Sequence, residues 1–183
     1  MTEDDVVWLV APSIEDDRPV IEFDAPANRG IDWARLDAVL QGERPLADCP
    51  EVGVVVQAPD ALAWGFYSVP GTLGLISAAL VEHIGPSAFR LFHLLPAKLN
   101  DAVYFFLKPV ETLPCLDLAR SEVAYFRSNP SHVKAITKYA FTKSMISDPL
   151  FSIPELPRLF ATPPVRDSVI RSGIPGVRFT AVG

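Results

Sequence analysis

Residues Tyr104 to Phe126 read YFFLKPVETLPCLDLARSEVAYF, and the rest of the chain is organised around this stretch. It starts as an apolar strand, which Lys108 and Pro109 interrupt, and it continues as a second strand or extended segment. A polar turn over residues 116–122 then leads into a second apolar run. We expect both apolar runs to be buried, with the polar turn between them.

The polar turn gathers Asp117, Arg120, Ser121 and Glu122. If it forms one helical turn, Asp117 and Ser121 lie on one face and Arg120 lies beside Asp117. In a structural interpretation, Asp117 caps the turn and pairs with Arg120. In a functional interpretation, the exposed part of the turn contacts a ligand or a partner. A catalytic role is disfavoured, because two carboxylates without a poised base or a metal make a poor active site.

Two strand–helix–strand units flank this stretch, over residues 73–95 and 159–182. In each unit a hydroxyl residue that can cap a helix precedes a short helical pattern, and a glycine follows it. These residues are Ser77 and Gly85 in the first unit and Thr162 and Gly173 in the second. Pro163 and Pro164 suit the first turn of the second helix, where amide hydrogens lack partners.

The remaining segments predict short strands and one further helix. Strands are expected at 6–10, 19–24 and 52–56, a helix at 32–42, a loop at 60–71 and a short edge strand at 150–153. We expect residues 19–24 to pair with the strand at 6–10. Residues 131–147 fit a strand with alternating faces, and a helix is almost equally compatible.

The predicted fold class is α+β, with a mixed, mainly antiparallel sheet and a few short helices that include the two strand–helix–strand units. The 18 prolines favour strand edges and irregular connections over long helices. We expect a single domain over residues 1–183. A softer division near residue 70 separates an acidic N-terminal part, 1–70, from the remainder, 71–183.

Charge is unevenly distributed along the chain. Residues 1–60 hold 14 acidic and 4 basic side chains, whereas residues 61–183 hold 8 acidic and 12 basic ones. Either the two parts complement each other when packed, or the acidic part offers a surface to a basic partner. Nucleic-acid binding by the acidic part is not expected, because phosphate contacts need clustered Lys and Arg.

No window of the sequence reaches the roughly 18 apolar residues of a membrane span, and the acidic N-terminus is unlike a secretory signal. We therefore expect a cytoplasmic location and no membrane partner. Cys49 and Cys115 are isolated and favour two buried free thiols over a disulfide. The three histidines are scattered, so we expect neither a metal site nor a cofactor.

Three aromatic residues, Trp64, Phe66 and Tyr67, fall in the predicted loop at 60–71. Exposed aromatics of this kind suit a protein interface, because they offer large contact areas. The alternative is that they pack the loop onto its own core.

A longer pattern resembles a known bacterial family. It consists of Leu116-Asp117-Leu118-x-x-Ser121 after an apolar strand, followed by Leu159-Phe160-Ala161-Thr162-x-x-Val165-x-x-x-Val169-x-x-x-Gly173-x-x-Gly176-Val177-x-Phe179. The family was once described as a domain of unknown function and is now grouped among the immunity proteins of polymorphic toxin systems. The resemblance covers residues 71–183 and implies a non-catalytic protein that binds and blocks a cognate toxin. It brings Asp117 and Ser121 forward as family-like positions.

The leading hypothesis is therefore an immunity protein that occludes its toxin, and a basic toxin such as a nuclease would suit the acidic part. The expected partner-binding residues are Asp117, Arg120, Ser121, Glu122, Trp64 and Tyr67. The alternative is an enzyme or small-molecule-binding protein with a pocket between the two strand–helix–strand units. The Asp117–Glu122 cluster would then lie at the mouth of the pocket. A third hypothesis is a scaffold that self-associates through a strand edge; the oligomeric state is not predicted.

Overall fold

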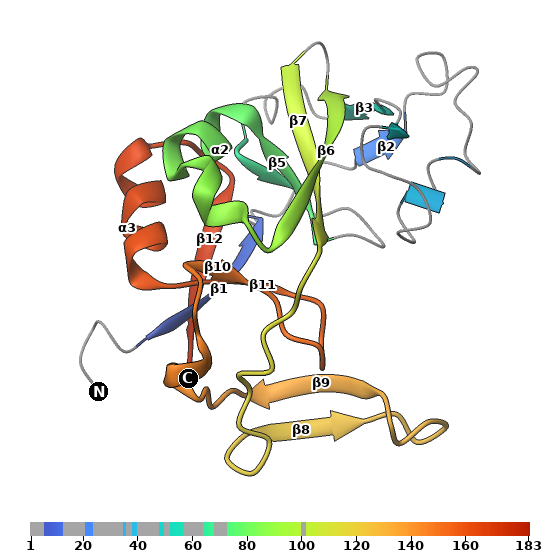
Figure 1. The fold of residues 1–183 in the computed structure, drawn as a ribbon, viewed down its shortest axis with the longest axis vertical. Coiled ribbons are helices and arrows are strands. Elements are labelled where there is room, and N and C mark those ends of the chain that lie inside the picture. The colour runs from blue at the N-terminus through green and yellow to red at the C-terminus, as the bar shows by residue number, and fades with distance from the viewer. Residues whose placement is uncertain are drawn as a thin grey trace.

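The computed structural model describes residues 6–12, 21–23, 35, 38–39, 48–49, 52–56, 64–67, 73–99 and 102–183 (Figure 1). The strands are β1 (Val7–Pro12), β2 (Ile21–Phe23), β3 (Val52–Val56), β4 (Phe66–Tyr67), β5 (Leu75–Ser77), β6 (Phe92–Leu99), β7 (Ala102–Pro109), β8 (Glu122–Tyr125), β9 (Val133–Lys138), β10 (Leu150–Phe151), β11 (Leu159–Ala161) and β12 (Val177–Val182). Two helices are described along their whole length, α2 (Ala78–Ile84) and α3 (Pro163–Ser172), and so are the short 3-10 turns η4 (Pro86–Phe89) and η5 (Lys143–Met145).

The described strands form three sheets. One has the order β10-β11-β1-β12, a second the order β2-β3-β6-β7-β5-β4, and the third consists of β8 and β9. The pair β3–β6 is parallel and the other strand pairs are antiparallel. The predicted α+β class with a mixed, mainly antiparallel sheet is confirmed.

Both strand–helix–strand units are present, and each encloses an inserted strand. β7 lies between β5 and β6, antiparallel to both, and β1 lies in the same way between β11 and β12. The helices α2 and α3 pack side by side (Figure 1), and Nε2 of His83 lies 2.9 Å from the carbonyl oxygen of Ser168. The similarity of the two segments in sequence therefore has a counterpart in their topology.

The helix ends follow the predicted signals with one exception. The hydroxyl of Ser77 accepts a hydrogen bond from the amide of Leu80 at 3.2 Å, and Gly173 ends α3 with φ of 68°. The side chain of Thr162 makes no capping hydrogen bond, and its hydroxyl instead donates to the carbonyl of Pro149 at 3.3 Å. Thr162 therefore joins the start of α3 to the segment just before β10.

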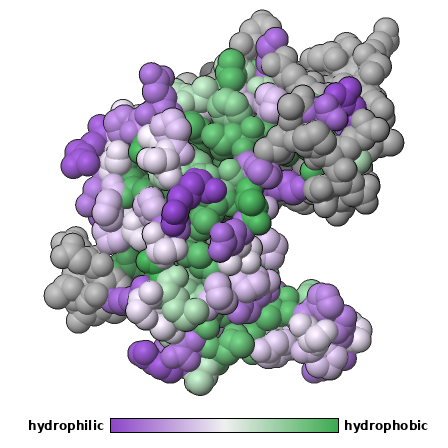
Figure 2. Space-filling view, in the orientation of Figure 1, coloured by the Kyte–Doolittle hydropathy of each residue, from purple (hydrophilic) through white to green (hydrophobic). Residues whose placement is uncertain are grey.

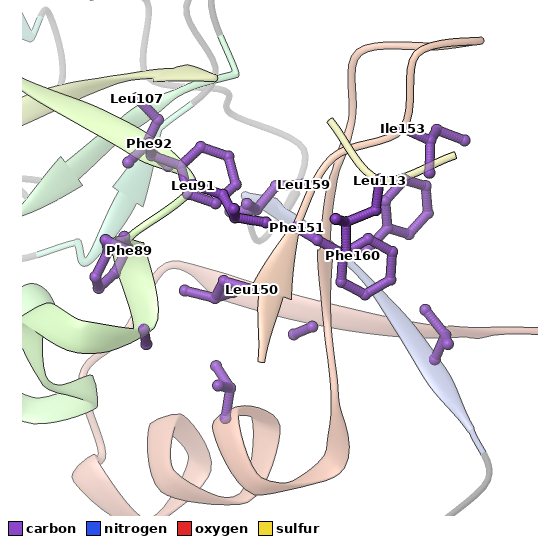
Figure 3. Packing of buried hydrophobic residues seen from close by; sticks show 14 of the residues in the cluster. Phe89, Leu91, Phe92, Leu107, Leu113, Leu150, Phe151, Ile153, Leu159 and Phe160 are labelled. Atoms are coloured by element: carbon purple, nitrogen blue, oxygen red, sulfur yellow. The ribbon is translucent and has the colours of Figure 1, made fainter. Parts of the chain in front are cut away.

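The larger hydrophobic core lies between the two units (Figure 3). Leu91, Phe92 and Leu107 line one end of the group drawn there, and Leu113 and Phe160 lie toward the other. Phe151 and Phe160 are fully buried, with ring centroids 5.5 Å apart. Truncation of a buried aromatic of this kind costs about 3–5 kcal/mol, so this group is a main source of stability.

Several predicted local elements are confirmed. Residues 7–12 and 52–56 are strands, residues 133–138 form a strand rather than a helix, and β10 is an edge strand. Arg35, Ala38 and Val39 are helical, and the rest of the predicted helix at 32–42 lies outside the described residues.

Two local predictions are wrong. β2 pairs with β3 instead of β1, because β11 and β12 already occupy both edges of β1. The predicted loop at 60–71 contains the strand β4, which pairs with β5 at the edge of its sheet. With β1 in one sheet and β2–β4 in another, the strands of the N-terminal part contribute to both large sheets.

Candidate interaction site

The two-stranded sheet of β8 and β9 stands apart from the other sheets (Figure 1). We call residues 118–138 the arm. Val123 pairs with Ile136; the side chain of Ile136 belongs to the larger core, and that of Val123 packs against it. Tyr125 and Phe126 lie farther along and are each 46% exposed. The expectation that this second apolar run is buried is therefore wrong for Tyr125 and Phe126, whereas Val123 packs against the core.

The base of the arm is firmly attached to the body. Leu116 and Phe141 form a β-bridge, and the amide of Thr142 donates to the carbonyl of Cys115 at 2.8 Å. The ring of Phe141 lies edge-on to Phe160, with centroids 5.5 Å apart. Because Phe141, Cys115 and Phe160 are all buried, the two chain segments that carry the arm start from the core itself.

The polar turn at 116–122 closes the base of the arm. Oδ1 of Asp117 accepts hydrogen bonds from the amides of Ala119 at 3.1 Å and Arg120 at 3.2 Å, as its predicted capping role requires. The hydroxyl of Ser121 accepts a bond from the amide of Ala140 at 3.0 Å and lies 3.4 Å from its carbonyl oxygen. Asp117 and Ser121 thus have structural roles.

The other two residues of the polar turn are exposed. Arg120 makes no ion pair with Asp117, although the structure describes both residues, so that predicted pair is wrong. Glu122 lies across from Lys138 in the sheet, and its carboxylate accepts a hydrogen bond from the hydroxyl of Thr137 at 3.4 Å. Arg120 and Glu122 therefore remain available to a partner.

The tip of the arm is ordered by its own hydrogen bonds. The amide of Phe126 donates to the carbonyl of His132 at 3.1 Å, and the amide of His132 donates to the carbonyl of Asn129 at 3.0 Å. Oδ1 of Asn129 accepts from the hydroxyl of Ser131 at 2.6 Å and from its amide at 3.3 Å. The exposed Tyr125, Phe126 and Arg127 are thus presented by a preorganised turn.

The arm concentrates exposed apolar and basic side chains. Among the residues that the structure describes, the exposed large apolar ones are Val103, Val110, Leu118, Tyr125, Phe126, Met145 and Ile170, and three of them belong to the arm. The arm also carries four basic residues, Arg120, Arg127, Lys134 and Lys138, and one carboxylate, Glu122. In Figure 2, hydrophobic surface continues from the body onto the base of the arm, and its far end is hydrophilic.

The aromatics at 64–67 do not form an exposed loop. Phe66 and Tyr67 are only 2% and 1% exposed, and the Trp64 ring stacks on Tyr67 with centroids 5.9 Å apart. The hydroxyl of Tyr104 donates to the carbonyl of Trp64 at 3.0 Å. The expectation of an exposed interface is wrong for Phe66 and Tyr67, and the alternative, packing onto the core, is confirmed.

An open hollow of about 480 Å³ lies between the two strand–helix–strand units. It is lined by Ser77, Ala78, Ala79, Ala102, Val103, Tyr104, Ser172, Gly173, Ile174 and Pro175. Its three hydroxyl groups already bond to the protein. That of Ser172 donates to the carbonyl of Val169 at 2.6 Å, that of Tyr104 donates to the carbonyl of Trp64, and that of Ser77 accepts from the amide of Leu80. The expected polar mouth is wrong, because Asp117, Arg120 and Glu122 lie in the polar turn and do not line the hollow.

The cysteines and histidines are dispersed. Cys49 and Cys115 are both free, and Cys115 is fully buried whereas Cys49 is half-buried. Burial raises the pKa of the Cys115 thiol to about 11, which makes it a poor nucleophile at neutral pH. The described part of the chain contains no group of three His, Cys, Asp or Glu residues that could hold a metal ion.

The acidic N-terminal part contributes little to the described surface. Asp48 pairs with Arg35 at 3.2 Å, and most of the other carboxylates before residue 60 lie outside the described residues. The predicted acidic docking surface therefore falls largely outside the described part of the chain.

No protein-family model matches the chain, and no curated protein is significantly similar to it. No helix in the described ranges has the length and apolar character needed to cross a membrane. The arm remains the feature of the described structure that is best suited to interact with another molecule. A hairpin that is held by contacts at its base and tip, and that exposes aromatic and basic side chains, is suited to bind a macromolecule.

The sequence pointed to the base of this site and missed its tip. Asp117, Arg120, Ser121 and Glu122 come together at the base, whereas Trp64 and Tyr67 lie at and beside β4 in another sheet. The missed residues are Tyr125, Phe126 and Arg127. The polar run Ser128-Asn129-Pro130-Ser131 directly after them is a turn signal that could have identified a hairpin.

Proposed function

We propose that the protein is a non-catalytic immunity protein that binds a cognate toxin through the arm and blocks it by occlusion. The single observation that carries this proposal is the exposure of Tyr125 and Phe126, each 46%, on a hairpin anchored in the core. Aromatic side chains at the centre of an interface commonly dominate its binding energy. The resemblance of residues 71–183 to immunity proteins supports the same function.

The anchoring of the arm supports a binding role for its tip. A flexible hairpin would lose conformational entropy on binding, which weakens affinity. Here the bridge between Leu116 and Phe141 fixes the base, and Asn129 fixes the tip. A partner would therefore meet side chains that are already in place. Occlusion then requires only that the arm enter or cover the substrate path of the toxin.

The test of this function is co-expression with the candidate toxin, which we take to be the product of the gene adjacent to the one that encodes this protein. We expect that product alone to arrest growth and the pair to restore growth and to co-purify. The matched variants are Tyr125→Ala/Phe126→Ala in the arm and Val103→Ala/Ile170→Ala outside it, since all four residues are exposed. Loss of rescue only in the arm variant supports the proposal. Equal rescue by both variants contradicts the role of the arm, and absence of any complex contradicts the immunity function.

A second candidate is a small-molecule site in the hollow between the two units. Its volume of about 480 Å³ lies within the range of ligand pockets. All three of its hydroxyl groups already make hydrogen bonds within the protein, however, so a ligand would find few polar groups to fix its orientation. This candidate is therefore supported less well than the arm.

A further inference from the structure

We propose that the arm recognises an acidic protein surface, so that the partner presents carboxylates around an apolar cleft that accepts Tyr125 and Phe126. This inference rests on the proposed function and specifies its partner. It assigns a negative charge to the partner surface, whereas the acidic N-terminal part would select a basic toxin. The arm carries four basic residues against one carboxylate on a chain whose net charge is −6.

The positions of the basic side chains support this polarity. Arg127 directly follows Phe126 at the tip, and Lys134 lies on β9 close behind it. Both are exposed, and neither makes an ion pair among the described residues. The carboxylate of Glu122 lies at the other end of the sheet, opposite Lys138. The tip is therefore the most positive part of the arm.

The mixture of side chains favours a protein over a nucleic acid. Nucleic-acid sites combine stacking aromatics with a continuous basic groove, whereas the arm offers separate cations and an aliphatic residue, Leu118, that is 49% exposed. An acidic protein surface requires only local complementarity, which chiefly accelerates association.

The experiment measures association of the purified full chain with an inactivated form of the adjacent gene product at 50, 150 and 500 mM NaCl. The test variant is Arg127→Glu/Lys134→Glu. The matched control is Arg171→Glu/Arg178→Glu, which changes the net charge equally at exposed positions outside the arm. We expect the arm variant to associate at least about tenfold more slowly at 50 mM NaCl, and the control to stay within about twofold of the parent protein.

The outcomes separate this inference from the proposed function. If the parent protein binds but the arm variant associates equally fast or faster, the partner is not acidic there; the inference fails while the immunity function stands. If the adjacent gene product does not bind the parent protein at all, the proposed function fails. Sedimentation velocity adds one further check: a dimer of the parent protein that the arm variant abolishes would identify a second copy as the occupant and overturn the inference.

Two labelled probes test the chemistry of the arm without the toxin. One is a 12-residue peptide of alternating Glu and Tyr, and the other is a 12-nucleotide oligothymidylate. We expect the peptide to bind more tightly than the oligonucleotide, and its binding to weaken at least about fivefold in the Arg127→Glu/Lys134→Glu variant. Tighter binding of the oligonucleotide, or equal binding of the peptide to parent and variant, overturns the inference.

Discussion

The hydroxyl of Ser121 and the backbone of Ala140 make a reciprocal contact at the base of the arm: the amide of Ala140 donates to the hydroxyl at 3.0 Å, and the hydroxyl lies 3.4 Å from the carbonyl. This contact joins the two chain segments just before they leave the body. Because both groups are partly buried, water replaces the lost partner poorly. Ser121 therefore controls how firmly the arm is held.

Replacement of Ser121 by Ala is expected to lower the free energy of unfolding by about 1–2 kcal/mol, because it leaves the Ala140 amide without its partner. Urea unfolding measures this change, and faster amide hydrogen exchange at Ala140 locates it. The control is Ser128→Ala at the tip, which removes a hydroxyl that makes no hydrogen bond to any described residue and should be nearly neutral. Equal stability of the two variants would show that the contact does not hold the arm.

Two glycines after α3 separate backbone strain from steric overlap. Gly173 and Gly176 both have positive φ, 68° and 84°, but an added Cβ meets nothing within 4 Å at Gly173 and lies 2.5 Å from Trp64 at Gly176. Gly173→Ala is expected to cost about 1–2 kcal/mol from conformation alone. Gly176→Ala is expected to cost a further 1–3 kcal/mol or so, because Trp64 must move. Urea unfolding with Trp fluorescence measures both, and equal costs would contradict the close packing of Trp64 on Gly176.

The ion pair between Arg90 and Asp148 is expected to make stability depend on pH. Hydrogen bonds from Arg90 hold the pKa of the buried Asp148 below its ordinary value. Its stabilising contribution is therefore complete above the unfolded pKa of about 3.9 and is lost as the pH falls through the lower folded value. Asp148→Asn should destabilise the protein at pH 7 and flatten the decrease in stability below pH 4.

Urea unfolding at pH 7, 5, 4 and 3 checks this dependence on pH. The control is Asp167→Asn, which removes a half-exposed carboxylate that pairs with the adjacent Arg166 at 2.8 Å. An exposed pair of this kind contributes little, so this variant should follow the parent protein at each pH. Parallel profiles for the parent protein and Asp148→Asn would contradict the role assigned to the pair.

The Cys115 thiol is expected to be inert in the folded protein, because it is fully buried and its pKa is raised to about 11. In a Cys49→Ser background, a disulfide reagent at pH 8 should label Cys115 only after unfolding in urea. The Cys49→Ser/Cys115→Ala variant provides the blank. Rapid labelling of Cys115 in the native protein would show an accessible, reactive thiol and would reopen a nucleophilic role.

The sequence predicts the individual helices and strands better than it predicts which strands pair with each other. Ser77 and Gly173 identify the start of one helix and the end of the other, because capping depends on residues within one turn. The insertion of β1 between β11 and β12 joins residues that are far apart in the sequence, such as Val10 with Leu159 and Val7 with Val182, and no local pattern records it. The same limit explains the wrong pairing of residues 19–24, since an alternating strand does not specify its neighbour.

The candidate site was predicted only in part, and the reason is related. Asp117 acts within its own turn, so its capping role could be recognised from spacing. Apolar character alone, however, does not distinguish a buried strand from an exposed interface, and Tyr125 and Phe126 were therefore assigned to the core. The opposite error concerned Tyr67, whose pairing in β4 with Leu75 from the next strand brings it into the interior.

The most direct test of the account is the affinity of the adjacent gene product for the parent protein and for Tyr125→Ala/Phe126→Ala, measured by titration calorimetry at one salt concentration. If the arm is the binding surface, the arm variant should bind about a hundredfold more weakly, while Val103→Ala/Ile170→Ala stays within about threefold. Unchanged affinity of the arm variant, with its fold intact by circular dichroism, would contradict the claim that this protein acts through its arm.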